Sequence, residues 1–326
     1  MYFHVKVIIA FILLMTVLGV LYIFRNEIEN LDVFKDSKEQ IVEKQTLSKD
    51  DQNLSEKNVI TKQTVPTVIK THTHTQEITK LRKFYEALHK VEGIYRNGKI
   101  LSARNIIYKI LDNKLVDEKT KIFWKSVTLL GKINSRIIFS DIPVPEKKSY
   151  TVKSGDTLVG ISKKNNTTVS LLQQGNSLDP ANSVIFPGQT LLLYPANWRI
   201  LIYKNYFKLL LYDGQKIFKA YDIAIGRQNR TPVGNFIVKN KQKEPVWTPP
   251  GRHIPYGDPE NVLGTRWIGL MPTKNTSKHL SGYGIHGTWE PESIGTEASK
   301  GCIRMRNEDV NELFDFVSLN VPVTIK

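Results

Sequence analysis

An uncharged apolar segment near the N-terminus constrains the architecture of this chain more than any other feature. Residues 7–24 carry no charge and are rich in Ile, Leu, Val and Phe. As a helix rising about 1.5 Å per residue, the segment would span roughly 27 Å, enough to cross the apolar part of a bilayer. A cleaved signal peptide needs a shorter apolar core and a small-x-small site, which the end of this segment lacks. The sequence therefore predicts an uncleaved transmembrane anchor within residues 1–25.

Length, charge and cysteine content narrow the class of protein. A chain of 326 residues with 40% hydrophobic and 24% charged residues should form two or three folded units with real cores. The net charge of +15 fits nucleic acid, anionic lipid or an acidic envelope polymer as a neighbour. The membrane segment and the lack of a recognisable nucleic-acid motif disfavour nucleic acid. Because Cys302 is the sole cysteine, we expect no internal disulfide, and we expect no metal or other cofactor.

Two stretches separate the predicted anchor from the first recognisable module. Residues 26–75 are polar and predict a flexible tether without a basic excess. Residues 76–142 have apolar residues at helical spacing and resemble one degenerate tetratricopeptide-type hairpin. A single repeat cannot bury a continuous core, so these helices either pack on the next domain or form a small bundle. We expect a spacer here, and a segment that binds a protein partner is the alternative.

Residues 148–196 predict the order strand, helix, helix, strand. Asp156 is placed to cap the first helix and Thr168 the second, and Pro187-Gly188-Gln189 turns the chain into the last strand. These residues resemble a LysM module. The matching positions are Tyr150, Val152, Gly155, Asp156, Thr157, Leu158, Ile161, Val169, Leu172, Asn176, Pro187, Gly188, Gln189, Leu191 and Pro195.

LysM modules bind glycans that contain N-acetylglucosamine, such as peptidoglycan. The resemblance therefore implies a wall-binding module. The glycan contacts that it implies lie in the turn with Gly155, Asp156 and Thr157 and in the loop that ends at Ile185.

The C-terminal segment, residues 198–326, contains strand-like runs separated by Asn, Asp and Gly turns and predicts a mainly β domain. His286 and Cys302 stand sixteen residues apart in it. Taken singly, a Cys is usually a small buried side chain and a His is usually structural. A thiol of pKa near 8.5 is only a few per cent thiolate at pH 7, so a catalytic Cys302 needs a base such as His286. Gly301 permits close backbone approach, and the amides near Cys302 could donate to an oxyanion.

The spacing and neighbours of this pair resemble the catalytic domain of the YkuD-type L,D-transpeptidases. That family has a His, a gap of similar length, then Ser/Thr-His-Gly-Cys with Arg or Asn two positions later; this chain has His286 and then Ser299-Lys300-Gly301-Cys302-Ile303-Arg304. Other segments that resemble this family include Thr231-Pro232 and Leu263-Gly264-Thr265. The departure is Lys300, which stands where the family often has a second His. Lys300 can lower the thiol pKa electrostatically but cannot act as a neutral base.

The resemblance implies a peptidoglycan L,D-transpeptidase that works through a cysteine acyl-enzyme. Cys302 would attack the carbonyl of the third residue of a stem tetrapeptide and release D-Ala, and an amine would then form a 3-3 cross-link or become attached to the wall. His286 would be the base, held in its tautomer by a backbone carbonyl such as that of Gly287, and the amides of Gly301 and Cys302 would bind the oxyanion. Ser299 would orient the loop. The residues that would contact substrate are Arg304, Gly287, Tyr283 and Trp267.

Other readings stay open at this point. Water in place of the amine would make the protein an L,D-carboxypeptidase, and an inert cysteine domain would leave a non-catalytic LysM wall-binding protein. For Arg304, a structural ion pair is as good an expectation as a substrate carboxylate.

The expected fold class is multidomain. It comprises a single N-terminal transmembrane helix, a small α-helical segment, an α+β LysM module and a mainly β transpeptidase domain. The expected location is the cytoplasmic membrane, with a single pass through residues 7–24. The catalytic part would lie outside the cytoplasm, in the periplasm or cell wall, with peptidoglycan as its partner.

Overall fold

The computed structural model describes residues 68–273 and 275–326, with side chains from residue 78 onward. The expected anchor at 7–24 lies outside the described residues, as does most of the expected tether. The fold class that we expected needs correction: among the described residues, no helix has both the length and the apolar character to cross a membrane. The physical reason is composition, since the two longest described helices, α3 (Val68–Arg96) and α5 (Lys121–Ile138), carry Lys and Arg along their length. What the structure describes is a helical segment, a LysM module and a mainly β domain.

The chain divides into two units, Met1–Lys90 and Val91–Lys326. Within the first unit, the structure describes helix from Val68 onward, so α3 begins inside the expected tether. The second unit contains the end of α3 and all later elements. The segment that connects α3 to the next helix turns at Gly98, whose φ of +77° is readily adopted by a glycine.

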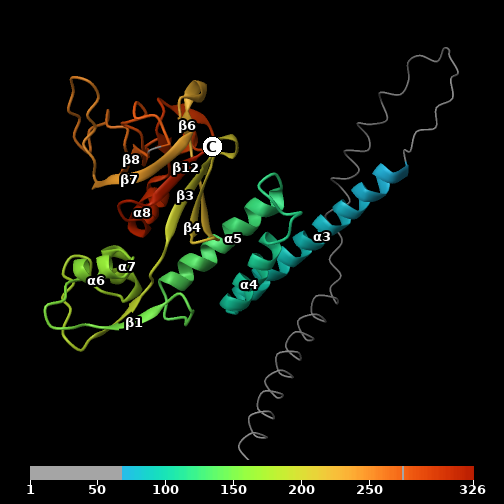
Figure 1. Ribbon diagram of the computed structural model, residues 1–326, viewed down its shortest axis with the longest axis horizontal. Helices are drawn as coiled ribbons and strands as arrows, with labels where there is room; N and C mark the ends of the chain where they lie inside the picture. Colours follow the sequence, from blue (N-terminus) through green and yellow to red (C-terminus); the bar gives the residue numbers. More distant parts are fainter. Residues whose placement is uncertain (1–67, 274) are drawn as a thin grey trace, which may run out of the picture. The chain divides into compact units, whose positions relative to one another are not determined.

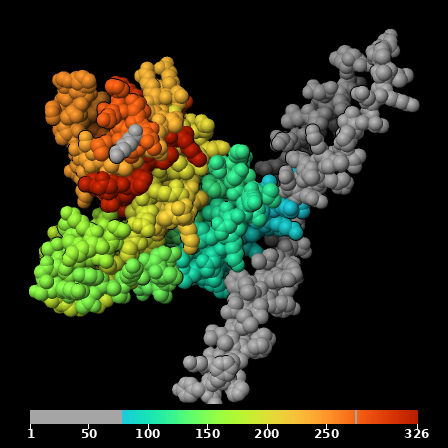
Figure 2. All heavy atoms as spheres, in the orientation of Figure 1, coloured from blue at the N-terminus to red at the C-terminus, as the bar shows by residue number. Residues whose placement is uncertain are grey.

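The helical segment packs on the C-terminal, mainly β domain, whereas the sequence had left open packing on the next domain along the chain or a small bundle. Helices α4 (Ile100–Leu111) and α5 contact each other, and the Thr120 hydroxyl caps α5 by accepting from the Phe123 amide at 3.3 Å. Along β5 (Lys216–Asp222), Asn134 of α5 donates to the Phe218 carbonyl at 2.8 Å. In the space-filling view the atoms of this segment abut the yellow strands of the catalytic domain (Figure 2). Because β5 is an edge strand of its sheet, α5 covers backbone that would otherwise be open to another chain.

The LysM module has the expected order of elements. Its strands β1 (Lys148–Thr151) and β2 (Thr190–Leu193) pair antiparallel, and α6 (Leu158–Lys164) and α7 (Val169–Gly175) lie between them in the chain. The cap of α7 is Thr168, as predicted, with its hydroxyl 3.1 Å from the Leu171 amide. The cap of α6 was predicted one residue too early: the hydroxyl of Thr157 accepts from the Gly160 amide at 3.0 Å.

The LysM module is joined to the catalytic domain through α8 (Asn307–Phe316). The Thr168 hydroxyl donates to the Asp315 carbonyl at 2.5 Å, and Gln174 donates to the Asp315 carboxylate at 2.9 Å. Leu171 of α7 belongs to the same buried cluster as the core of the catalytic domain. The module therefore shares part of its hydrophobic core with the catalytic domain.

The catalytic domain is built on one eight-stranded sheet of order β11-β9-β8-β7-β12-β3-β4-β5, with a small sheet of β10 and β6 beside it (Figure 1). In β3 the burial alternates strictly, which places Trp198, Ile200 and Ile202 in the core, where Trp198 stacks on Phe316 of α8 at 5.6 Å. The remaining bounds are β3 Trp198–Tyr203, η1 Lys204–Tyr206, β4 Lys208–Asp213, β6 Ile225–Gly226, η2 Arg227–Asn229, β7 Gly234–Lys243, β8 Arg266–Pro272, β9 Gly284–His286, η3 Pro291–Ser293, β10 Glu297–Ser299, β11 Ile303–Arg304 and β12 Pro322–Ile325.

Candidate active site

The pairing of β9 with β11 brings the two halves of the sequence motif together. The strands are parallel, with Ile303 beside Ile285 and Arg304 beside His286. Side chains alternate along a strand, so Ile285 and Ile303 enter the core while His286 and Arg304 face the other side. Cys302 immediately precedes β11. The sixteen residues between His and Cys are thus the connection through η3 and β10 between two neighbouring strands.

His286 is buried and held by backbone carbonyls. Its Nδ1 lies 2.7 Å from the Gly287 carbonyl oxygen, the contact expected from the sequence. A carbonyl only accepts, so Nδ1 carries the proton of the neutral ring and Nε2 keeps the basic lone pair. Burial, the largest cause, and the Arg304 charge together lower the pKa of His286 to about 4, against the opposing effect of the Gly287 and Leu263 carbonyls. The imidazole is therefore neutral at pH 7, as a general base must be.

Cys302 is partly exposed, and burial raises the pKa of its thiol above the ordinary value. A hydrogen bond with the Gly284 backbone and the Arg304 charge both act in the opposite direction. With a raised thiol pKa and a lowered imidazole pKa, the resting pair consists of a protonated thiol and a neutral imidazole. The nucleophile must consequently be deprotonated during the reaction.

The Ser299 hydroxyl clamps the loop that carries the thiol. It accepts from the Gly301 amide at 3.0 Å and donates to the Cys302 carbonyl at 2.6 Å. This agrees with a loop-orienting role for Ser299. Because the Gly301 amide already has an acceptor in Ser299, the Cys302 amide is the better candidate of the two predicted oxyanion donors.

We expect Ser299→Ala to lower kcat by about tenfold to a hundredfold, because the loop would no longer hold Cys302 within the tolerance of the attack geometry. The Gly301 amide would also lose its acceptor, at a cost of about 1–3 kcal/mol in the free energy of unfolding. Steady-state kinetics and urea unfolding measure the two effects, with Ser299→Thr as the control that keeps a hydroxyl. An unchanged kcat in Ser299→Ala would show that the clamp is not needed.

A second hydroxyl, that of Thr231, also fixes the loop that carries Cys302. It donates to the Gly301 carbonyl at 2.9 Å and accepts from the Gly226 amide at 2.7 Å, and its side chain is fully buried. Gly301 has φ +142°, and a Cβ there would lie 2.8 Å from the Tyr283 ring. Tyr283, which was expected at the substrate, packs against the backbone of the nucleophile loop. In the sequence, Thr231 stood out only as part of a segment that resembles the family, without an assigned role.

Trp267 lies against the catalytic histidine. It is paired with His286 across β8 and β9, and the two rings stack with centroids 6.0 Å apart at an interplanar angle of 24°. A Cβ on Gly284 would come within 2.4 Å of the indole, so a glycine at this position makes room for the stack. The indole nitrogen donates to Asn240 at 3.2 Å. Trp267, expected to contact substrate, is thus placed to hold the imidazole plane.

The loop that precedes β8 is fixed by the start of α8. The Asn307 side-chain oxygen accepts from the Thr265 amide at 3.1 Å. A Cβ at Gly264 or Gly287 would fall 2.4 Å or 2.1 Å from that oxygen. Asn307 therefore keeps the loop with Leu263, whose carbonyl acts on His286, close to the Gly287 turn. Sequence reasoning missed Asn307. The signal that could have found it is its position just after β11, close to the Cys302 motif.

Comparisons with known proteins agree with this geometry. The YkuD family, an L,D-transpeptidase catalytic domain, matches residues 197–325, and the LysM domain matches residues 150–193. A protein of Bacillus licheniformis named "Putative L,D-transpeptidase YkuD" is 35% identical over 185 residues, which cover 54% of this chain and 97% of the relative. Its namesake from Bacillus subtilis is 34% identical over 183 residues, covering 54% of this chain and 98% of the relative. The chain belongs to the L,D-transpeptidase family.

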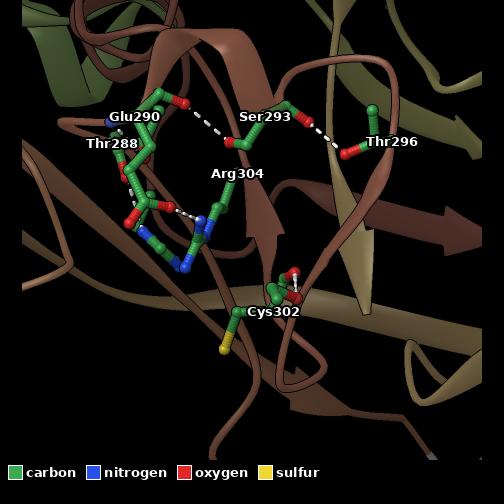
Figure 3. Close-up of polar contacts among 9 residues, drawn as sticks. Thr288, Glu290, Ser293, Thr296, Cys302 and Arg304 are labelled. Atoms are coloured by element: carbon green, nitrogen blue, oxygen red, sulfur yellow. Dashed lines mark hydrogen bonds and ion pairs between the residues drawn. The ribbon is translucent and has the colours of Figure 1, made fainter. Parts of the chain in front are cut away.

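In this L,D-transpeptidase, Arg304 makes an ion pair with Glu290. Its Nη1 lies 2.7 Å from the Glu290 Oε2, and the side chains are 13% and 61% exposed respectively. Figure 3 shows the guanidinium reaching the Glu290 carboxylate while the Cys302 sulfur points away from that ion pair. Of the two roles open for Arg304, the structure contains the ion pair. Within the described residues, no group of three or more His, Cys, Asp or Glu is arranged to hold a metal ion.

The predicted glycan-binding residues lie in the LysM module and are used in its own fold. The Asp156 carboxylate accepts from the Tyr150 hydroxyl at 2.7 Å and from the Lys153 amide at 2.9 Å. Thr157 caps α6, Gly155 has φ +83° in the turn, and Ile185 packs on the module core. Glycan contacts in this turn would therefore come from backbone groups.

Proposed function

We propose that this L,D-transpeptidase acts on peptidoglycan stem tetrapeptides through an acyl-enzyme on Cys302. The single observation that carries the proposal is the parallel pairing of β9 with β11, which brings a buried, neutral His286 beside the strand that follows the partly exposed Cys302. His286 takes the thiol proton as the sulfur bonds to the carbonyl carbon of the third stem residue. The amide bond to D-Ala breaks, and that proton leaves on the amine of D-Ala.

The second half of the reaction reverses the roles. His286 accepts a proton from an incoming amine as its nitrogen attacks the thioester, and the carbon–sulfur bond breaks. The proton returns to the Cys302 sulfur, and the product is a 3-3 cross-link or another amine joined to the wall. The Cys302 amide is the candidate donor to the oxyanion in both steps.

The LysM module and the single cysteine support a function at the cell wall. The LysM module indicates peptidoglycan binding and shares a core with the catalytic domain, so it would hold the active site close to the glycan. A single cysteine gives the thiol no partner for an intramolecular disulfide in an oxidising compartment. We place the catalytic part outside the cytoplasm, where its substrate is. The helical segment, which covers the β5 edge, serves as a structural support of the catalytic sheet.

The test is product analysis with the full chain. Incubation with disaccharide-tetrapeptide should yield dimers that lack one D-Ala, detected by mass spectrometry. Tripeptide alone would show that water resolves the acyl-enzyme and would make the protein an L,D-carboxypeptidase. Retention on insoluble peptidoglycan, measured by sedimentation, tests the LysM part separately, and a chain that stays in the supernatant would contradict glycan binding.

A further inference from the structure

The two partners of the ion pair between Arg304 and Glu290 differ strongly in solvent exposure, unlike those of an ordinary surface pair. Arg304 is almost covered, whereas the Glu290 side chain extends into solvent. The backbone of Glu290 is nevertheless well fixed: its amide donates to the Thr288 hydroxyl at 3.1 Å, and its carbonyl accepts from the Ser293 hydroxyl at 2.7 Å. Thr296 extends this chain of hydroxyl bonds by donating to the Ser293 carbonyl at 2.7 Å (Figure 3). A rigid turn thus presents a solvated carboxylate to a buried guanidinium.

The position of Arg304 relates this pair to the reaction. It lies two residues after Cys302 and beside His286 across the parallel pair, and its charge acts on both the Cys302 thiol and the His286 ring. In a stem tetrapeptide, the leaving residue carries a free carboxylate one carbon away from the nitrogen of the scissile amide. The group on the substrate that suits a guanidinium close to the reacting residues is this carboxylate. Arg304 offers five donors in a planar fork, and its hydrogen bond to Glu290 uses one of them.

The energetics favour exchange of one carboxylate for another. An ion pair with one exposed partner contributes only a small stabilisation, because water competes for the carboxylate and salt screens it. Removing both carboxylates would leave the Arg304 charge nearly covered and unpaired, which costs more. A substrate carboxylate that replaces Glu290 keeps the guanidinium paired, while Glu290 returns to water at little cost.

We propose that Glu290 is a specificity-determining residue that occupies, in the free enzyme, the place on Arg304 taken by the terminal carboxylate of the donor stem. This inference rests on the proposed function and adds to it the group that competes with the donor. Glu290 therefore weakens the binding of donors that bring a carboxylate to this place, because that carboxylate has to displace Glu290 from Arg304. A donor with an amide there gains no exchange partner.

The test compares binding of two ligands, the stem tetrapeptide and its C-terminal amide, to the full chain carrying Cys302→Ala. Glu290→Gln in that background should tighten binding of the acid by about two- to fivefold, the factor that an exposed ion pair represents. Binding of the amide should not change. Glu292→Gln is the matched control, since Glu292 is an exposed carboxylate in the same turn outside this ion pair and its loss should change neither ligand.

Kinetics of the otherwise unmodified chain supply a second readout. Glu290→Gln should lower KM for the acid donor by a similar factor with kcat nearly unchanged, a split that a merely structural loss would not produce. Equal effects on acid and amide, or weaker binding of the acid, would overturn the proposal. If the chain shows no turnover, the proposed function fails, while the binding comparison still decides the role of Glu290.

Discussion

The Cys302→Ala variant is expected to lose turnover of a stem tetrapeptide by at least about 10⁴-fold, because the nucleophile of the acyl-enzyme is gone. The clamp of Ser299 and Thr231 bonds to the backbone of this loop and does not involve the sulfur. The loop should therefore keep its shape, and retention on peptidoglycan should equal that of the natural sequence. Product formation by mass spectrometry and sedimentation with insoluble peptidoglycan check the two halves.

The matched control is Cys302→Ser, which keeps a nucleophilic atom of higher pKa. A hydroxyl is far harder to deprotonate than a thiol, so this variant should also be strongly impaired. Full activity in Cys302→Ala would refute the mechanism, and loss of peptidoglycan retention would show that the change had damaged the fold.

Replacing His286 has the second-largest expected effect. His286→Gln should lower kcat by about 10²–10⁴-fold, the range associated with a positioned general base. In the natural chain, the base is lost only when the imidazole is protonated, and burial lowers its pKa to about 4. Activity should therefore persist from pH 7 down to pH 5 and fall near pH 4. A profile of kcat/KM against pH measures this, and an acid limb between pH 6 and 7 would contradict a buried neutral base.

The same pKa shift links folding to pH. In the unfolded chain the imidazole regains an ordinary pKa near 6.5, whereas in the folded chain it stays neutral down to about 4. Protons therefore bind the unfolded state first as the pH falls, and the free energy of unfolding should drop between pH 6.5 and 4. The full loss from this group is about 3 kcal/mol. His286→Gln should remove this component, which denaturant unfolding at pH 7 and pH 4.5 can measure.

The sequence predicted the module order and the strand-rich domain, and it proposed the reacting pair. These depend on short-range signals: the text around Cys302, the caps and turns of the LysM module, and alternating strands such as β3. The hydrogen bond from His286 to the Gly287 carbonyl was also anticipated, because it joins neighbouring residues.

The remainder depends on contacts between distant residues. The Gly301 amide was expected at the oxyanion, but the Ser299 hydroxyl occupies it in a loop whose φ of +142° is not visible in sequence. Thr231 bonds to Gly301, 70 residues away along the chain, and Asn307 bonds to Thr265, 42 residues away. The stacking of Trp267 on His286 was not predicted, because the pairing of β8 with β9 cannot be read from the neighbouring sequence. The expected anchor at 7–24 lies outside the described residues. Among the residues that the structure does describe, no helix is long and apolar enough to cross a membrane.

The most direct test of the account is the intact mass of the full chain during reaction with a stem tetrapeptide. With a tetrapeptide whose own amines are blocked, so that no acceptor amine is present, the chain should gain the mass of that tetrapeptide minus D-Ala, and fragmentation should place this acyl group on Cys302. Addition of an acceptor amine should then return the chain to its original mass as the cross-linked product appears. Turnover without an adduct, or an adduct on any other residue, would contradict the cysteine acyl-enzyme.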